Sequence, residues 1–239
     1  MRLLRGDGPL IRVGHRGAAA LAPENTLPSF EAALAYGVDA IEFDVLDLDA
    51  GPLVIAHSRE EARPGRPTLD EALDFLAGRN VGLHVDLKLT TRLEEVVEAL
   101  GRHGVAERTV VSSFHLPTLR VVAACAPHVR IGFTYPEDRY GVSKRRALRP
   151  AVRLGTLALR RAVVARVPAM LARAGAEALM LQHAVVSAGA VARAHAAGAA
   201  VWAWTVDDPV ELARLEAAGV DAVITNDPRL FSAVATLPT

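Results

Sequence analysis

The chain has 239 residues, of which 51% are apolar, with 27 basic residues, 27 acidic residues and a single cysteine. This length and apolar content fit one large domain with a substantial buried core, and the lone Cys125 cannot form an internal disulfide bond. A formal net charge of zero does not favour a nucleic-acid-binding protein. No run approaches the roughly 18–20 apolar residues of a membrane span, and the N-terminus lacks a signal-peptide pattern, so we expect a cytoplasmic protein.

Short apolar runs alternate with longer runs of helical period along the whole chain. The predicted strands are residues 10–14, 40–48, 81–89, 109–114, 129–135, 178–186, 200–206 and 221–225. The predicted helices are residues 26–37, 69–78, 92–104, 117–126, about 156–174, 187–198, 208–219 and 228–235. This alternation favours an α/β fold, a (β/α)₈ TIM barrel that forms one domain over residues 1–239. A doubly wound open sheet is the alternative.

Nearly every predicted strand ends in polar or aromatic residues. His15 and Arg16 follow the first strand, and Trp204 lies near the end of the seventh. In a barrel, the carboxyl ends of all strands form one ring, so such residues become neighbours however far apart they are in the sequence. Active sites of barrels lie in that ring, and we expect the functional residues there.

The second and third predicted strands contain charged residues where a buried parallel strand should be apolar. Glu42 and Asp44 are two residues apart and share one face of their strand, as do Asp86 and Lys88. Carboxylates in a low-dielectric barrel mouth need neutralising, and a bound divalent cation would do so. Carboxylate ligands without cysteine favour Mg²⁺, Ca²⁺ or Mn²⁺ over zinc. The alternative is that Lys88 and Arg16 pair with these carboxylates and no metal is bound.

Two histidines follow apolar runs at the ends of a strand and a loop. His15 and His57 are candidates for a general acid and base, because imidazole transfers protons near neutral pH. Arg16, beside His15, offers a guanidinium fork that suits a phosphate. A cation site, phosphate-binding side chains and two histidines together predict phosphoryl-transfer chemistry.

Short motifs run in order from one end of the chain to the other. They are HRG (15–17), PENT (23–26), ExDV (42–45), the histidine at 57, DLK (86–88), SF (113–114), WAWTVDDP (202–209) and GVDAVITNDP (219–228). In this order and combination, the chain resembles the glycerophosphodiester phosphodiesterase family over nearly its whole length. The resemblance implies hydrolysis of a small-molecule glycerophosphodiester to glycerol 3-phosphate and an alcohol.

The resemblance also implies a mechanism and a role for each site residue. The substrate's own 2-hydroxyl would attack phosphorus, and water would then open the cyclic phosphate. The implied roles are metal ligation by Glu42, Asp44 and Asp86, acid–base catalysis by His15 and His57, phosphate binding by Arg16 and Lys88, and packing near the glycerol by Trp204. The implied cofactor is a divalent cation, Mg²⁺, Ca²⁺ or Mn²⁺.

The chain departs from the family pattern at two positions. Ser58 follows His57 where the family usually has aspartate, which removes an acceptor near that imidazole. Asp86 stands where the family usually has glutamate, so its carboxylate reaches about one methylene less far. We expect these changes to affect rate and cation preference.

Residues 139–173 form an unusual connection between the fifth and sixth predicted strands, with ten Lys or Arg residues and no Asp or Glu. Four arginines would share one helical face: Arg146, Arg149, Arg153 and Arg160. One hypothesis is a basic amphipathic lid that contacts anionic phospholipid at a membrane surface. The alternative is a solvated helix packed on the barrel, with arginines paired to acidic residues; Pro150 and Gly155, which predict interruptions of a long helix, favour it.

Two other functions remain open at this point. One is a lysophospholipase D-type activity on the same fold, which would require an acyl chain on the substrate. The other is a non-catalytic barrel that binds phosphodiesters, an interpretation that Ser58 keeps open. Both histidines and all three carboxylates are present, which argues against the second.

Overall fold

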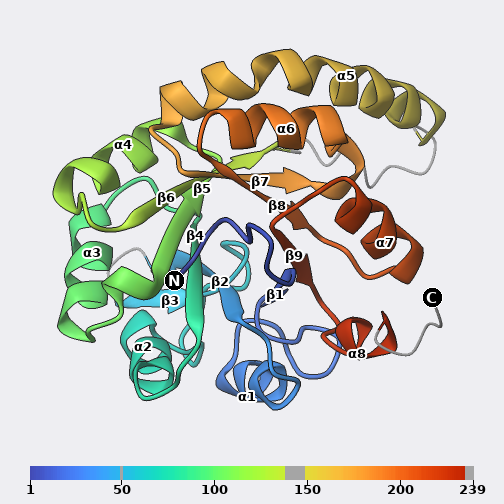
Figure 1. Cartoon of the computed structure of the whole chain (residues 1–239). Coiled ribbons are helices and arrows are strands. Elements are labelled where there is room, and N and C mark those ends of the chain that lie inside the picture. Colours follow the sequence, from blue (N-terminus) through green and yellow to red (C-terminus); the bar gives the residue numbers. More distant parts are fainter. Residues whose placement is uncertain (49–50, 138–148, 235–239) are drawn as a thin grey trace.

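The computed structural model describes residues 1–48, 51–137 and 149–234, without the side chains of 149–153, 233 and 234. The strands are β1 (Ile11–Gly14), β2 (Ala40–Asp47), β3 (Leu53–Ile55), β4 (Gly82–Leu87), β5 (Thr109–Ser113), β6 (Arg130–Tyr135), β7 (Ala178–Gln182), β8 (Ala200–Trp204) and β9 (Ala222–Thr225). All but β3 are parallel, and β1 pairs with both β2 and β9, so the sheet closes on itself. The predicted TIM barrel is confirmed (Figure 1).

Helices surround this barrel (Figure 1). They are α1 (Leu27–Ala35), α2 (Leu69–Ala77), α3 (Leu93–Arg102), α4 (Leu116–Cys125), α5 (Arg149–Ala174), α6 (Ala188–Ala196), α7 (Pro209–Ala217) and α8 (Leu230–Val234). The long helix α5 lies outermost, alongside α6 (Figure 1). None of the described helices is long and apolar enough to cross a membrane.

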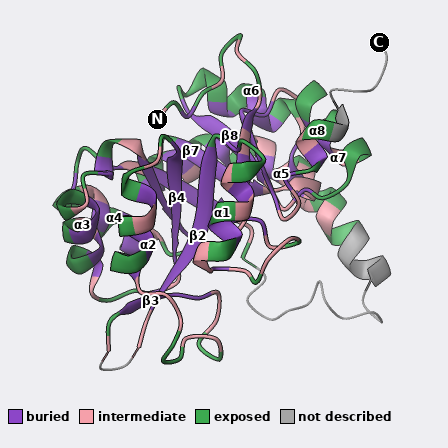
Figure 2. Cartoon of the chain, turned by 90° about the horizontal axis from the view of Figure 1, so that it is seen from below, coloured by how far each residue is buried: buried purple, intermediate pink, exposed green. Residues whose placement is uncertain are grey.

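The strands have two different apolar faces, and both are buried (Figure 2). Side chains such as Val85 and Leu179 belong to the large core that includes the helices. A second cluster, which includes Met180 and Trp202, comes from alternate strand positions on the inner face. The N-terminal segment packs on this inner cluster, where the Trp202 Nε1–H donates to the carbonyl of Leu3 at 3.1 Å. The N-terminal segment therefore fills this end of the barrel.

Some element boundaries differ from the sequence-based expectations. Strand β3, antiparallel to β2, was not expected, and it extends the barrel wall just before His57. The sixth expected strand, 178–186, ends at Gln182 and continues as the short 3₁₀-helix η4 (His183–Val185).

The expectation that Pro150 and Gly155 would interrupt the basic helix is wrong, because α5 runs continuously from Arg149 to Ala174. Pro150 lies in the first turn, where a missing backbone N–H breaks no helical hydrogen bond. Arg146 and the rest of 138–148 lie outside the described residues, as do the side chains of Arg149 and Arg153.

A tight turn at the end of β1 requires a glycine. Arg16 and Gly17 have φ angles of 50° and 85°, a left-handed conformation that residues with a Cβ rarely adopt. A Cβ atom on Gly17 would lie 2.4 Å from Ser29 Oγ and 2.6 Å from the Ser29 carbonyl carbon. The turn brings the backbone N–H of Gly17 to the carbonyl of Glu42 at 3.2 Å, so it fixes the loop after β1 to β2.

We expect Gly17→Ala to destabilise the fold by about 2–4 kcal/mol, because the new methyl group adds a clash to left-handed strain. The matched control is Gly101→Ala in α3, where a Cβ meets nothing within 4 Å. That change should stabilise the protein by up to about 1 kcal/mol. Urea unfolding of both variants measures the difference, and equal stabilities would contradict this interpretation of the turn.

Candidate active site

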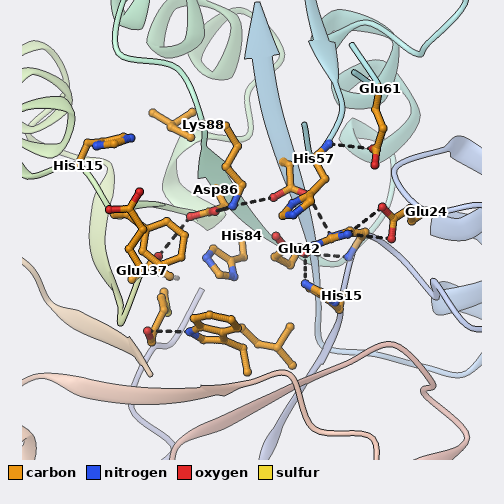
Figure 3. Close-up of a pocket in the computed structure, with 18 residues that line it drawn as sticks. His15, Glu24, Glu42, His57, Glu61, His84, Asp86, Lys88, His115 and Glu137 are labelled. Atoms are coloured by element: carbon orange, nitrogen blue, oxygen red, sulfur yellow. Dashed lines mark hydrogen bonds and ion pairs between the residues drawn. The ribbon is translucent and has the colours of Figure 1, made fainter. Parts of the chain in front are cut away.

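A cavity of about 690 Å³ opens at the carboxyl ends of the strands. All of the sequence-predicted site residues line it: His15, Arg16, Glu42, Asp44, His57, Asp86, Lys88 and Trp204. Figure 3 shows the labelled side chains of His15, Glu42, His57, Asp86 and Lys88 converging from several strands and loops. The structure thus brings together the complete predicted set.

Asp44 lies at the centre of the charged network. Its Oδ2 is 3.2 Å from Arg16 Nε and 3.3 Å from His57 Nδ1, and its Oδ1 is 3.1 Å from Lys88 Nζ. The side-chain amide of Asn25 donates to Oδ2 at 2.9 Å, and Asn25 Oδ1 accepts from the backbone N–H of Asp44. Burial opposes ionisation of Asp44, but Lys88, His57 and Arg16 hold its pKa well below the usual range. Asp44 is therefore an ionised carboxylate that contacts both cationic side chains, Arg16 and Lys88.

Glu42 is much less well neutralised. It is 4% exposed and accepts a 2.7 Å hydrogen bond from the backbone N–H of Arg16. Burial and the neighbouring charge of Asp44 raise the pKa of Glu42 well above its usual range. A buried carboxylate beside a second negative charge is an environment that an additional cation would stabilise.

His15 is held in one tautomer by its neighbour. Its Nδ1 lies 2.6 Å from Oδ1 of Asn226, an acceptor, so the ring proton resides on Nδ1. Burial and the charge of Arg16 lower the pKa of His15 to about 4. At neutral pH, Nε2 is therefore an unprotonated acceptor, 3.9 Å from Oε2 of Glu42.

Arg16 and Lys88 are permanently charged at neutral pH. Arg16 Nη1 lies 2.8 Å from both carboxylate oxygens of Glu24, and Lys88 pairs with Asp86 as well as Asp44. Burial alone would lower the pKa of Lys88, but Asp86 and Asp44 raise it above the ordinary value. These side chains therefore present two fixed positive charges to the cavity.

An aromatic pair borders the cavity. The rings of Phe114 and Trp204 meet edge to face with centroids 6.1 Å apart. The Trp204 Nε1–H donates to the carbonyl of Met180 at 2.9 Å, which fixes the orientation of the indole. The rings offer an apolar surface beside the charged network.

Several residues near the network were not singled out as site residues from the sequence. They are His84, Ser112, Thr134, Glu61, Glu137 and Asn226. The alternation of β4 could have revealed His84, because it lies two residues before Asp86 and shares its face. The others come from loops or from strands without a charged pattern, so only the closed barrel brings them to the site.

The residues present fit the expected divalent cation in part. Glu42 and Asp44 supply hard oxygen donors, and the poorly neutralised Glu42 favours a nearby cation. However, no group of three or more acidic, histidine or cysteine side chains among the described residues forms a ready metal site. Lys88 lies between Asp44 and Asp86, as the metal-free alternative anticipated, so the three-carboxylate site remains a prediction.

This arrangement, with histidines, fixed cations and carboxylates around the mouth of a closed barrel, is that of a barrel enzyme acting on an anionic substrate. The model of the glycerophosphoryl diester phosphodiesterase family matches residues 15–74 and 60–230. The chain belongs to this family, which confirms both the resemblance found in the sequence and its assignment as an enzyme.

Relatives of known name cover nearly the whole chain. A probable glycerophosphodiester phosphodiesterase 2 of Mycobacterium tuberculosis is 32% identical, covering 92% of this chain and 88% of the relative. A glycerophosphodiester phosphodiesterase of Caldanaerobacter subterraneus subsp. tengcongensis is 25% identical, over 90% and 93%. An Oleispira antarctica phosphodiesterase, solved with the product sn-glycerol-3-phosphate, is similar in fold, with a TM-score of 0.73, 24% identity and coverage of 95% and 97%.

Two histidines at the mouth of the barrel should make stability depend on pH. The pKa values of His15 and His84 are both lowered from 6.5 to about 4, mainly by burial. Between these pH values the unfolded chain binds protons that the folded protein does not, so stability falls as the pH decreases from about 6.5 to about 4. Each histidine should contribute up to about 3 kcal/mol to this loss.

We expect His84→Asn to flatten the decrease, because the variant has no imidazole to protonate at this position. Thermal unfolding in a chelator between pH 7 and pH 4 measures the effect. His128→Asn, at an exposed position, is the control and should follow the native curve. A native pH dependence in His84→Asn would contradict the assignment.

Proposed function

We propose that this protein hydrolyses glycerophosphodiesters to glycerol 3-phosphate and an alcohol, by histidine acid–base catalysis assisted by a divalent cation. The observation that supports this most strongly is the convergence of Arg16, His57 and Lys88 on the carboxylate of Asp44. His15 lies beside them, with its Nε2 3.9 Å from Glu42 Oε2. The named relatives support the same reaction.

The tautomer of His15 suits it to act as the base. Its Nε2 would accept the proton of the attacking 2-hydroxyl while the new oxygen–phosphorus bond forms. The phosphorus–oxygen bond to the alcohol would break, and protonated His57 would donate a proton to that leaving oxygen. Asp44 Oδ2, 3.3 Å from His57 Nδ1, would orient the imidazole for this transfer. Water would then open the cyclic phosphate, with the two histidines exchanging roles.

Charge on the phosphoryl oxygens would be stabilised by Arg16 and Lys88, which the carboxylates hold in place before the substrate binds. A divalent cation held by Glu42 and Asp44 would add Lewis-acid polarisation of a phosphoryl oxygen. Trp204 and Phe114 would pack against the carbon skeleton of the glycerol.

The direct test is phosphorus NMR of glycerophosphoethanolamine incubated with the purified protein and Mg²⁺, Ca²⁺ or Mn²⁺. We expect a glycerol 3-phosphate signal that grows with time and stops when a chelator is added. His15→Ala and His57→Ala should lower kcat by about 10²–10⁴-fold, the usual contribution of acid–base catalysis.

The control is His128→Ala, at an exposed position that does not line this cavity. It should retain native turnover. No phosphate-ester product with any cation would rule out the proposed reaction, and full activity in the His15→Ala variant would rule out the proposed base.

Lysophospholipids are a second candidate substrate class, favoured by the exposed beginning of α5. Leu154 and Leu157 are 71% and 57% exposed, and Arg161 on the same helical face is also exposed. Further along, Val163 and Val167 are buried, so the helix also packs on the barrel as the alternative hypothesis required. We propose that the exposed end contacts anionic lipid surfaces.

We expect sedimentation with vesicles containing phosphatidylglycerol, but not with pure phosphatidylcholine vesicles. The double variant Leu154→Ser/Leu157→Ser should lose most of this binding, because it removes the apolar contacts. Val210→Ser is the matched control, since Val210 is 78% exposed on α7. Equal sedimentation of the double variant and the native protein would contradict a role for this surface.

A further inference from the structure

We infer that Asp86 is a positioning residue for Lys88 and not a ligand of the cation. This inference rests on the proposed function and assigns different roles to the three carboxylates of the site. Glu42 and Asp44 would hold the cation without Asp86, while Asp86 fixes the ammonium group that binds the phosphate.

The oxygens of Asp86 already accept from three groups. Oδ1 accepts from the hydroxyls of Ser112 and, at 3.2 Å, Thr134, while Oδ2 accepts from the ammonium of Lys88. A carboxylate has about four lone-pair sites, so one remains, on Oδ2 beside the positively charged ammonium of Lys88. Ser112 and Thr134 are themselves buried, and turning Oδ1 toward a metal would leave their two hydroxyls without an acceptor.

A histidine behind Ser112 reinforces this orientation. His84 Nε2 lies 2.8 Å from Ser112 Oγ, and both residues are buried. Because the single proton of the Ser112 hydroxyl goes to Asp86, its oxygen accepts from His84, and the ring proton therefore resides on Nε2. His84 Nδ1 has no hydrogen-bond partner among the described residues. In this series of hydrogen bonds, His84 donates to Ser112 and Ser112 donates to the carboxylate of Asp86.

The register of the neighbouring strands explains why an aspartate at position 86 can reach these hydroxyl groups. Asp86 on β4 is in register with Ser112 on β5 and with Asp44 on β2. At one methylene shorter than glutamate, the Asp86 carboxylate lies near the barrel wall, within reach of the hydroxyls of β5 and β6. Glu42 contrasts with it, because within the described part of the chain its carboxylate accepts one hydrogen bond, from the backbone N–H of Arg16.

The consequence concerns Lys88, which contacts both Asp44 and Asp86. Asp44 would be shared between Lys88 and the cation, so a second carboxylate is needed to hold the ammonium in place. Asp86, anchored by two hydroxyls, meets this need. Loss of Asp86 should therefore weaken phosphate binding more than cation binding.

Two binding measurements separate the roles. Electron paramagnetic resonance of free Mn²⁺ gives the cation Kd, and calorimetry gives the Kd of glycerol 3-phosphate. We expect Glu42→Gln to raise the Mn²⁺ Kd at least tenfold and Asp86→Asn to raise it less than threefold. Asp86→Asn should weaken glycerol 3-phosphate binding at least fivefold. An equal loss of Mn²⁺ affinity in both variants would overturn the inference.

A double-mutant cycle tests whether Asp86 acts through Lys88. In a Lys88→Ala background, Asp86→Asn should cause no further loss of glycerol 3-phosphate affinity; additive losses would overturn the positioning role. Ser112→Ala should weaken glycerol 3-phosphate binding in the same direction. Ser113→Ala is the matched control, a buried serine on the same strand that donates to the carbonyl of Leu87, and it should change binding less than twofold.

Failure of the proposed function gives a different result. If the native protein binds glycerol 3-phosphate but no Mn²⁺, the proposed cation is wrong, and the double-mutant cycle alone decides the role of Asp86. If it binds neither, the proposed function and this inference both fail. Thermal unfolding of each variant identifies any that do not fold.

Discussion

The site depends on one constraint, the burial of a charged carboxylate, Asp44, inside the mouth of the barrel. Asp44 is 1% exposed, and a carboxylate can remain ionised there only if positive charges and hydrogen-bond donors surround it. Arg16, Lys88, His57 and Asn25 supply these partners from different segments of the chain. The positions of Arg16 and Lys88 that suit a bound phosphate are thus also the positions that stabilise the buried negative charge of Asp44.

This shared requirement links folding and function. The left-handed turn at Arg16 and Gly17 places a backbone N–H on Glu42 and the guanidinium on Asp44. This turn, which a larger residue at position 17 would strain, sets the position of a charged side chain. Burial and the charge of Asp44 raise the pKa of Glu42 well above its usual range, so its ionised form is poorly compensated. A cation beside Glu42 would stabilise that ionised form, which is the physical reason to expect a cation beside the substrate.

The sequence predicted the barrel and the residues that line its cavity well, because both predictions depend on local patterns. Alternating strands and helices, and charged pairs two residues apart as at Glu42 and Asp44, follow directly from strand periodicity. The hydroxyls of Ser112 and Thr134 carry no such signal, because serine and threonine occur in ordinary strands. Ser112 acquires a role only through its register with Asp86, and Thr134 only because the closed barrel brings its hydroxyl to 3.2 Å from Asp86 Oδ1. The continuity of α5 was also missed, because a proline in a first turn and one inside a helix look alike in sequence.

The most direct test of the central claim is diffraction from crystals grown with Mn²⁺ and glycerol 3-phosphate, recorded at the manganese absorption edge. We predict one anomalous peak within ligand distance of Glu42 and Asp44, with the phosphate against Arg16 and Lys88 and the Lys88 to Asp86 contact intact. A peak ligated by Asp86, or a phosphate bound away from Arg16, would contradict the proposed organisation of the site.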